Sequence, residues 1–156
     1  MANSQALCTS FKQELLNGSH AFGAQAANGT RTVTTKDTFK GALYLTTASL
    51  GASTTAYSST NELAASGNYT AGGNAVTNAT APTTSGTTAF WTPSAALTWA
   101  ALTSSGAFDA VLIYNTASTG SLAVSVHTFG SQNITAGTLT INMPANAAGT
   151  ALVQIA

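Results

Sequence analysis

Charged side chains are the scarcest feature of this sequence. Asp, Glu, Lys and Arg make up 5% of its 156 residues, against about 25% in ordinary soluble domains. Four basic and four acidic residues leave a formal net charge of zero. Because nucleic-acid binding needs a basic stripe that neutralises phosphates, we expect no direct nucleic-acid partner. Intrinsic disorder is excluded, since disordered chains are charge-rich and this one is 44% hydrophobic.

Cysteine and histidine are nearly as rare. The one cysteine, Cys8, excludes an internal disulfide and any cysteine-cluster metal site. His20 and His127 stand isolated in the sequence, without the orienting partner that a catalytic imidazole requires. No glycine-rich phosphate loop and no acidic Ca²⁺ loop is present. We therefore expect no enzymatic activity, no metal and no cofactor, and we interpret both histidines as surface or hydrogen-bonded structural residues.

Long apolar runs are missing as well. No stretch approaches the length of a membrane span, so we expect no membrane partner. Residues 1–5 show no basic region followed by an apolar run, which is the mark of a secretory signal peptide. The sequence therefore predicts synthesis in a cytoplasm.

Short segments with strand-like alternation fill most of the chain. The apolar run at 110–114 suits a central strand covered on both faces, and it forms a predicted hairpin with 121–129. Turns rich in Gly, Asn and Pro separate the segments, and no fixed repeat occurs. This pattern indicates an all-β sandwich or jelly roll. The expected strands cover residues 30–35, 38–46, 74–80, 87–92, 96–102, 110–114, 121–129, 138–143 and 150–155.

One substantial helix is expected, at the N-terminus. Ser4 can cap a helix that starts at Gln5, and Asn17 followed by Gly18 supplies the stop. We expect residues 1–18 to pack as this helix on a single β-domain formed by residues 19–156. Since Cys8 lies on the apolar stripe, we expect a buried, unreactive thiol. The stripe consists of Leu7, Cys8, Phe11, Leu15 and Leu16.

The segment 48–73 keeps neither helical nor strand period. A loop of this length in a compact domain is usually functional or poorly ordered. Its Tyr57, Leu63 and Tyr69 indicate that it packs on its own domain or on a neighbour. All four basic residues precede position 41, so this part of the chain offers a modest positive charge to an acidic partner. The residues that we expect to contact a partner are Lys12, Arg31, Lys36, Tyr57, Leu63 and Tyr69.

Low charge also bears on assembly. With zero net charge, little electrostatic repulsion keeps copies of the chain apart, which favours a role in a multi-copy assembly. The aromatic residues Trp91, Trp99, Tyr57 and Tyr69 leave a second reading open, a face that binds a glycan or a receptor. Large aromatic side chains more often fill a core or an interface.

Across most of its length the chain resembles the head decoration, or capsid cement, proteins of tailed bacteriophages. The matching features are CTSFKQELL at 8–16, DTFK at 37–40, ALY at 42–44, LGASTTAY at 50–57, Glu62, Gly67, Tyr69, Gly72, Gly73, IYN at 113–115 and IA at 155–156.

The resemblance implies a β-sandwich of jelly-roll type with one N-terminal α-helix. It also implies a structural virion protein on the outer capsid surface, which bridges neighbouring major capsid protein subunits. We expect such a protein to form a homo-oligomer, a dimer or a trimer. The alternative is an adhesin or glycan-binding β-domain associated with the tail or a fibre.

Overall fold

The computed structural model describes residues 2–23, 35–78 and 80–156 and shows an all-β chain with one helix among these residues. The fold class predicted from the sequence is therefore confirmed at the level of all-β. The elements in chain order are β1 (Ala6–Leu7), α1 (Thr9–Leu16), β2 (Phe39–Leu45), β3 (Asn74–Val76), β4 (Thr83–Ser85), β5 (Thr88–Trp91), β6 (Leu97–Leu102), β7 (Phe108–Asn115), β8 (Ala123–Gln132), β9 (Gly137–Ile141) and β10 (Val153–Ile155).

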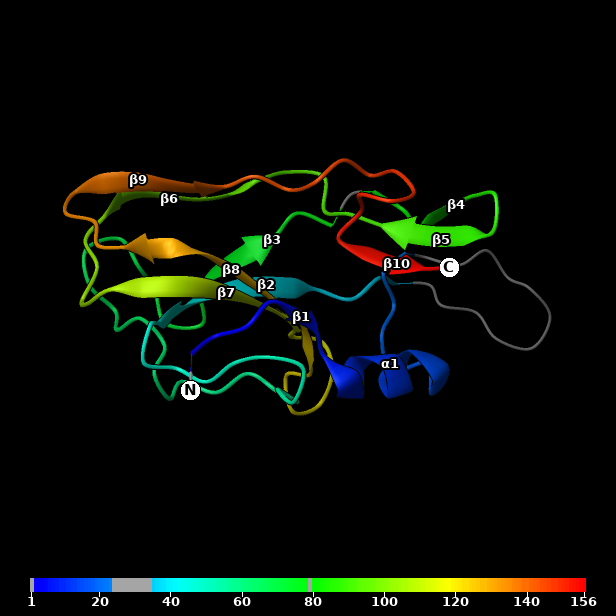
Figure 1. Cartoon of the computed structure of the whole chain (residues 1–156), viewed down its shortest axis with the longest axis horizontal. Coiled ribbons are helices and arrows are strands. Elements are labelled where there is room, and N and C mark those ends of the chain that lie inside the picture. Colours follow the sequence, from blue (N-terminus) through cyan, green and yellow to red (C-terminus); the bar gives the residue numbers. More distant parts are fainter. Residues whose placement is uncertain (1, 24–34, 79) are drawn as a thin grey trace.

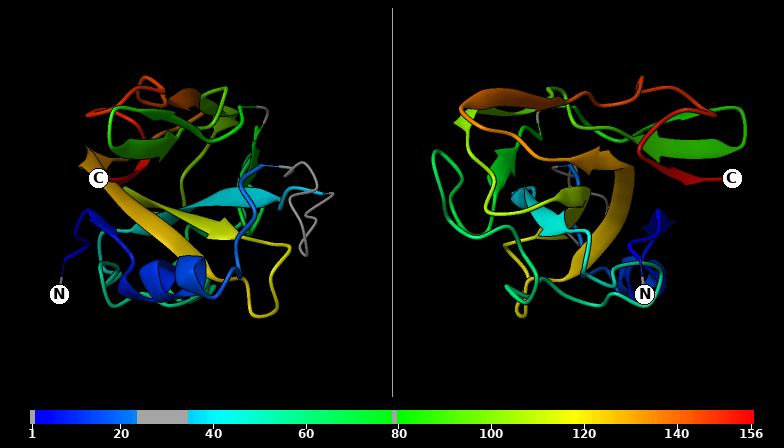
Figure 2. Two further views of the ribbon diagram at one scale, coloured as in Figure 1. Left: turned by 90° about the vertical axis from the view of Figure 1, so that its right-hand side faces the viewer. Right: turned by 60° about the vertical axis from the view of Figure 1, so that its left-hand side comes forward.

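The described strands form two layers (Figure 1). One layer is a five-stranded antiparallel sheet with the strand order β1-β8-β7-β2-β3. The other layer contains a three-stranded sheet, β10-β5-β4, beside a two-stranded sheet, β6-β9. Helix α1 and long connecting segments lie on the opposite side of the five-stranded sheet (Figures 1 and 2). The large sheet is thus covered on both faces.

Strand β7 lies in the middle of the large sheet, and the core lies against both of its faces. It pairs with β2 in a register that runs from Phe39 opposite Asn115 to Leu45 opposite Phe108. On one face β2 approaches β6 so closely that a Cβ added to Gly41 would lie 2.4 Å from Leu97 Cδ1. On the other face the Tyr114 hydroxyl donates to the Gly72 carbonyl, 2.8 Å away. The prediction of a central strand covered on both faces is confirmed.

The segment between β2 and β3 is fixed by backbone hydrogen bonds to several elements. The amide of Leu63 donates to the carbonyl of Leu43, and that of Leu45 donates to Asn61. Further along, the amide of Tyr57 bonds to the β7–β8 turn, and the N-terminal residues bond to 50–52. The segment therefore forms the second cover of the large sheet, in the absence of regular strand structure.

The N-terminal prediction is wrong in its boundary. The helix was expected to start at Gln5. Instead, Ala6 and Leu7 form β1, which pairs with Ser125 and Val126 of β8. Ser4 caps nothing, because its hydroxyl donates to the Leu50 carbonyl, and α1 starts only after Cys8. Sheet pairing has overridden the local helical pattern, so the N-terminal segment belongs to the β-domain itself.

The other strand predictions from residue 38 onward are confirmed, although β3 and β10 are shorter than expected. Strand β4 was not predicted, because three hydroxyl residues carry no apolar alternation. The strand expected at 30–35 and the turn before it lie outside the described residues, apart from Thr35.

Gly73 provides a test of how tightly the long segment is attached. It has φ +70°, and a Cβ at this position would lie 1.9 Å from the Gly41 carbonyl oxygen, a backbone atom that cannot move aside. We expect Gly73→Ala to lower the free energy of unfolding by about 3 kcal/mol or more, measured by urea denaturation.

The matched control is Gly120→Ala. Gly120 has φ +87° but nothing within 4 Å of an added Cβ, so only the backbone strain of about 1 kcal/mol should appear. Equal losses in the two variants would show that the contact with Gly41 does not constrain the segment.

Candidate functional site

A buried carboxylate, Glu62, organises the long segment. Its Oε1 accepts hydrogen bonds from the Tyr69 hydroxyl at 2.7 Å and from the Gly72 amide at 2.6 Å. Its Oε2 accepts the Tyr57 hydroxyl at 2.6 Å. Among the described residues no lysine or arginine lies within salt-bridge distance of this group. The carboxylate is therefore held by hydrogen-bond donors that the segment itself supplies.

All four tyrosines of the chain gather around this carboxylate. Tyr57 stacks on Tyr114, with ring centroids 4.6 Å apart. The Tyr44 hydroxyl donates to the Ser58 carbonyl, and the Tyr69 hydroxyl, besides donating to Glu62, accepts the amide of Leu43. We call Glu62 with these four tyrosines the tyrosine cluster. It ties the segment between β2 and β3 to the large sheet.

Burial of the phenols, with the nearby Glu62 charge, raises the pKa of all four tyrosines above the usual value. For Tyr114 these effects raise the pKa to about 12, and the direction is the same for Tyr44, Tyr57 and Tyr69. Hydrogen bonds to Glu62 add to the increase in the pKa of Tyr57 and Tyr69. The hydroxyls therefore stay protonated donors, so the geometry supports attachment of the segment.

His20 forms a second hydrogen-bonded cluster. The Asn115 side chain uses its oxygen to accept the amides of Ala117 and Ser118, so its nitrogen must donate, and it lies 3.1 Å from His20 Nδ1. His20 Nε2 therefore carries the proton and donates to Glu14 at 2.8 Å. Both ring nitrogens are engaged, so the prediction of a hydrogen-bonded histidine is confirmed for His20. The expectation that this imidazole lacks an orienting partner is wrong, because the Glu14 carboxylate provides one.

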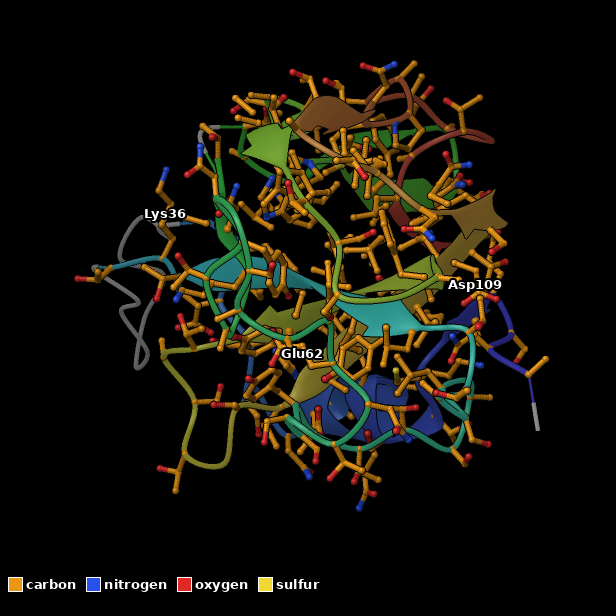
Figure 3. The ribbon with its side chains drawn as sticks, turned by 90° about the vertical axis from the view of Figure 1, so that its left-hand side faces the viewer. Lys36, Glu62 and Asp109 are labelled. Atoms are coloured by element: carbon orange, nitrogen blue, oxygen red, sulfur yellow. The ribbon has the colours of Figure 1, made fainter. Side chains whose placement is uncertain are left out.

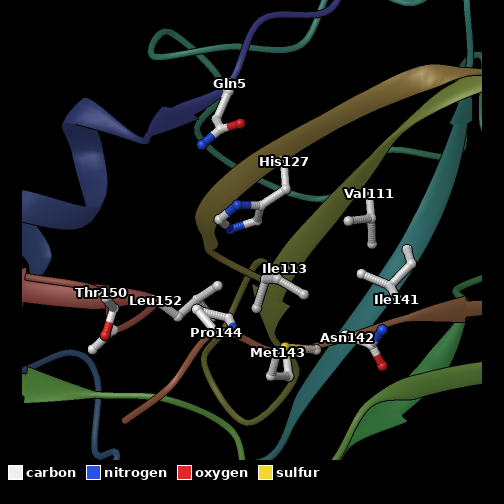
Figure 4. Close-up of a pocket in the computed structure, with 11 residues that line it drawn as sticks. Gln5, Val111, Ile113, His127, Ile141, Asn142, Met143, Pro144, Thr150 and Leu152 are labelled. Carbon is white, nitrogen blue, oxygen red and sulfur yellow. The ribbon is translucent and has the colours of Figure 1, made fainter. Parts of the chain in front are cut away.

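His127 has a different setting, at the side of a hollow in the described structure. This pocket holds about 410 Å³ between the large sheet and the chain after β9. Figure 4 shows His127 projecting from β8 into the space between Gln5 and Leu152. Burial lowers the pKa of His127, and its Nε2 lies 2.9 Å from the Ser125 hydroxyl. Apolar side chains of β7 and β9 line much of the pocket, and no aromatic platform for a sugar ring is among them.

The predicted contact residues fall into two groups. Lys12 and Lys36 are exposed and free to meet a partner, and Arg31 lies outside the described residues. Leu63 and Tyr69 are only 1% and 3% exposed, and Tyr57 is partly buried. The expectation that the segment presents Leu63 and Tyr69 to a partner is therefore wrong, because Glu62 and the large sheet draw them inward.

The tryptophans and the cysteine are core residues. Trp91 and Trp99 are buried, so neither indole provides an open stacking surface. Cys8 is buried as well, and burial, together with the charge of Glu14, raises the pKa of its thiol to about 11. The predictions that the indoles fill a core and that the thiol is buried are confirmed. The raised pKa of the thiol favours the expected lack of reactivity.

Every acidic side chain of the sequence accepts an intramolecular hydrogen bond. Glu14 and Glu62 do so as described, Asp37 accepts the Ala21 amide and the Asn115 side chain, and Asp109 accepts the Asn3 side chain at 2.6 Å. None of the four acidic residues is more than partly exposed. In Figure 3 Glu62 lies among the ribbons, whereas Lys36 projects at the periphery. Sequence reasoning missed this use of the carboxylates, although Glu62 was the only acidic residue of a tyrosine-bearing segment.

In the described ranges, no group of three or more His, Cys, Asp or Glu side chains is placed to hold a metal ion. No helix of these ranges has the length and apolar character that a membrane crossing needs.

The tyrosine cluster predicts a ranking of stability losses. Glu62→Ala leaves two buried donors and one partly buried donor without an acceptor and should cost about 3 kcal/mol or more. Glu62→Gln keeps one oxygen and should cost about 1–2 kcal/mol. Asp109→Asn, a partly exposed carboxylate with one bond, is the matched control and should cost under about 1 kcal/mol. Urea denaturation measures all three, and similar losses at Glu62 and Asp109 would contradict the role given to Glu62.

The raised tyrosine pKa values predict how the protein responds to alkali. A tyrosine whose pKa is higher in the folded chain than in the unfolded chain stabilises the fold fully below the unfolded value of about 10. That stability is lost as the pH rises from there toward the folded value. We expect tyrosinate absorbance to appear together with loss of the circular-dichroism signal. Titration of all four phenols near pH ~10 with the fold intact would contradict the cluster.

In comparisons with protein-family models, with curated proteins and with solved structures, nothing matches this chain.

Proposed function

We propose that this chain is a structural virion protein of a tailed bacteriophage. It decorates the outer capsid surface and cements the shell by bridging neighbouring major capsid protein subunits. It is made in the host cytoplasm, acts without catalysis or cofactor, and associates as a dimer or trimer. The proposal joins the sequence resemblance to the surface chemistry described above.

The observation that carries the proposal is the internal use of all four acidic side chains. Soluble monomers ordinarily rely on exposed charges of both signs to stay apart. Here the outward-facing residues of β4 and β9 are threonine and serine, and exposed small residues continue through 144–150. Such a surface can be buried against neighbours with few ions to desolvate, which suits dense packing in a lattice.

The stabilising mechanism is mass action. A protein that binds the assembled shell and not its separated subunits stabilises the shell by RT ln(1 + [L]/Kd) at each site. At a free concentration one hundred times Kd this is about 2.7 kcal/mol per site. A fixed cover over the large sheet, held by the tyrosine cluster, lets such a bridge transmit force with little internal adjustment.

The finer fold assignment belongs to the same proposal. Two layers of antiparallel strands support a β-sandwich, and we assign it to the jelly-roll type on the resemblance. For the alternative, a glycan-binding adhesin domain, the buried indoles and the non-aromatic pocket offer no favourable observation.

The test uses a phage that encodes this chain. We expect intact particles to contain it at a copy number comparable to that of the major capsid protein, measured on a stained gel. Heads from a phage with the coding sequence deleted should lose DNA at a lower temperature and recover when the purified chain is added. A few copies confined to the tail, or no binding to heads, would overturn the proposal.

A further inference from the structure

An apolar hollow lies where α1 meets the smaller three-stranded sheet. It holds about 190 Å³ between the end of the helix and strands β5 and β10. This volume is enough for one aromatic ring or one branched aliphatic side chain. Figure 2 (left) shows this end of the molecule, with α1 below and the C-terminal strand above. The residues that line the hollow are Leu15, Phe22, Pro82, Ala89, Phe90, Trp91, Val153 and Ile155.

Two large apolar side chains of the described residues are exposed, one at the end of α1 and one in the lining of the hollow. Leu16, which follows the lining residue Leu15, is 91% exposed, and Ile155, itself part of the lining, is 58% exposed. The sequence pattern placed Leu16 on the buried stripe of the helix, and that prediction is wrong. Its exposed apolar surface is unfavourable in water, and a partner that buries this surface gains that free energy on binding.

The exposed charged side chains of α1 and of the described residues just before β2 have one sign. Lys12 is exposed and lies one helical turn before Leu16, on the same face of α1. Lys36 is exposed next to Asp37, whose amide bonds to Ala21 beside the lining residue Phe22. The carboxylates of Glu14 and Asp37 are held by internal donors. This end of the chain thus offers apolar contact and positive charge without a competing free acidic side chain.

We propose that this surface, defined by Leu16, Ile155, Lys12 and the hollow, is the docking site for a protein that inserts an apolar side chain flanked by carboxylates. The inference rests on the proposed function, in which the partner is the major capsid protein. The hollow takes the apolar side chain, and the lysines meet the carboxylates at the rim, where ion pairs set orientation and association rate.

A second copy of the chain fits this surface less well. A two-fold interface uses the same patch of both copies, so the lysines of both copies would share one contact. Such a contact would have to bury like charges beside Leu16, with no free acidic side chain at this end to neutralise them. Charge complementarity therefore favours a different, acidic protein.

The experiment measures binding of the purified chain to heads from the deletion phage, by co-sedimentation. We expect Leu16→Asp and Ile155→Asp each to weaken binding at least about tenfold, because each removes a buried apolar contact. Lys12→Glu should weaken binding about two- to fivefold at low salt, and the difference from the wild type should shrink as salt rises. Ser131→Asp, near the exposed C-terminal end of β8 and at the far end of the molecule, should bind as the wild type does.

Circular dichroism and thermal unfolding check that each variant folds, and Leu16→Ser provides a gentler substitution if Leu16→Asp does not. Wild type that fails to bind heads would overturn the proposed function. Wild type that binds, with Leu16 and Ile155 variants that bind equally well, would overturn only this docking site. A wild-type dimer in sedimentation equilibrium that Leu16→Asp converts to monomer would assign the surface to a second copy and overturn the inference.

Discussion

The fold depends on one buried carboxylate, that of Glu62. Hydrogen-bond donors hold it in place, and among the described residues no lysine or arginine pairs with it. Glu62 accepts hydrogen bonds from two phenols and a backbone amide. Through these bonds the segment between β2 and β3 is held against the large sheet and forms one side of the core. An unpaired buried charge would ordinarily be costly, but several donors from the same segment share it. The Tyr69 hydroxyl then accepts the Leu43 amide, so the network continues into the backbone of the large sheet. The two faces of β2 are thus stabilised differently, by apolar packing on one side and by a polar network on the other.

Sequence reasoning recovered the features that local periodicity determines. The alternation in β2 and the apolar run of β7 predicted the centre of the sheet, because side-chain direction in a strand is set by residue order. It failed where long-range pairing decides. Ala6 and Leu7 have helical neighbours, yet they pair with a strand more than a hundred positions away. No local pattern reports such a partner.

The candidate site was harder to predict than the fold, for a related reason. Tyr69 and Leu63 lie in a segment without period, so nothing in their order tells which side of the backbone faces inward. Their direction is set by Glu62, whose role becomes visible only when four tyrosines from separate stretches meet. The exposed lysines were predictable, because an ammonium group avoids burial wherever the chain places it.

Cys8 gives this protein a practical property. It is the chain's single thiol, it is buried, and its pKa is raised to about 11, so little thiolate exists near neutral pH. A cysteine engineered on the open surface of β9 would therefore be the one site that a maleimide reagent modifies, without removal of the native residue. Fluorophores or heavy-atom labels could be attached at one defined position per copy, and their spacing would report how the copies are arranged on a particle.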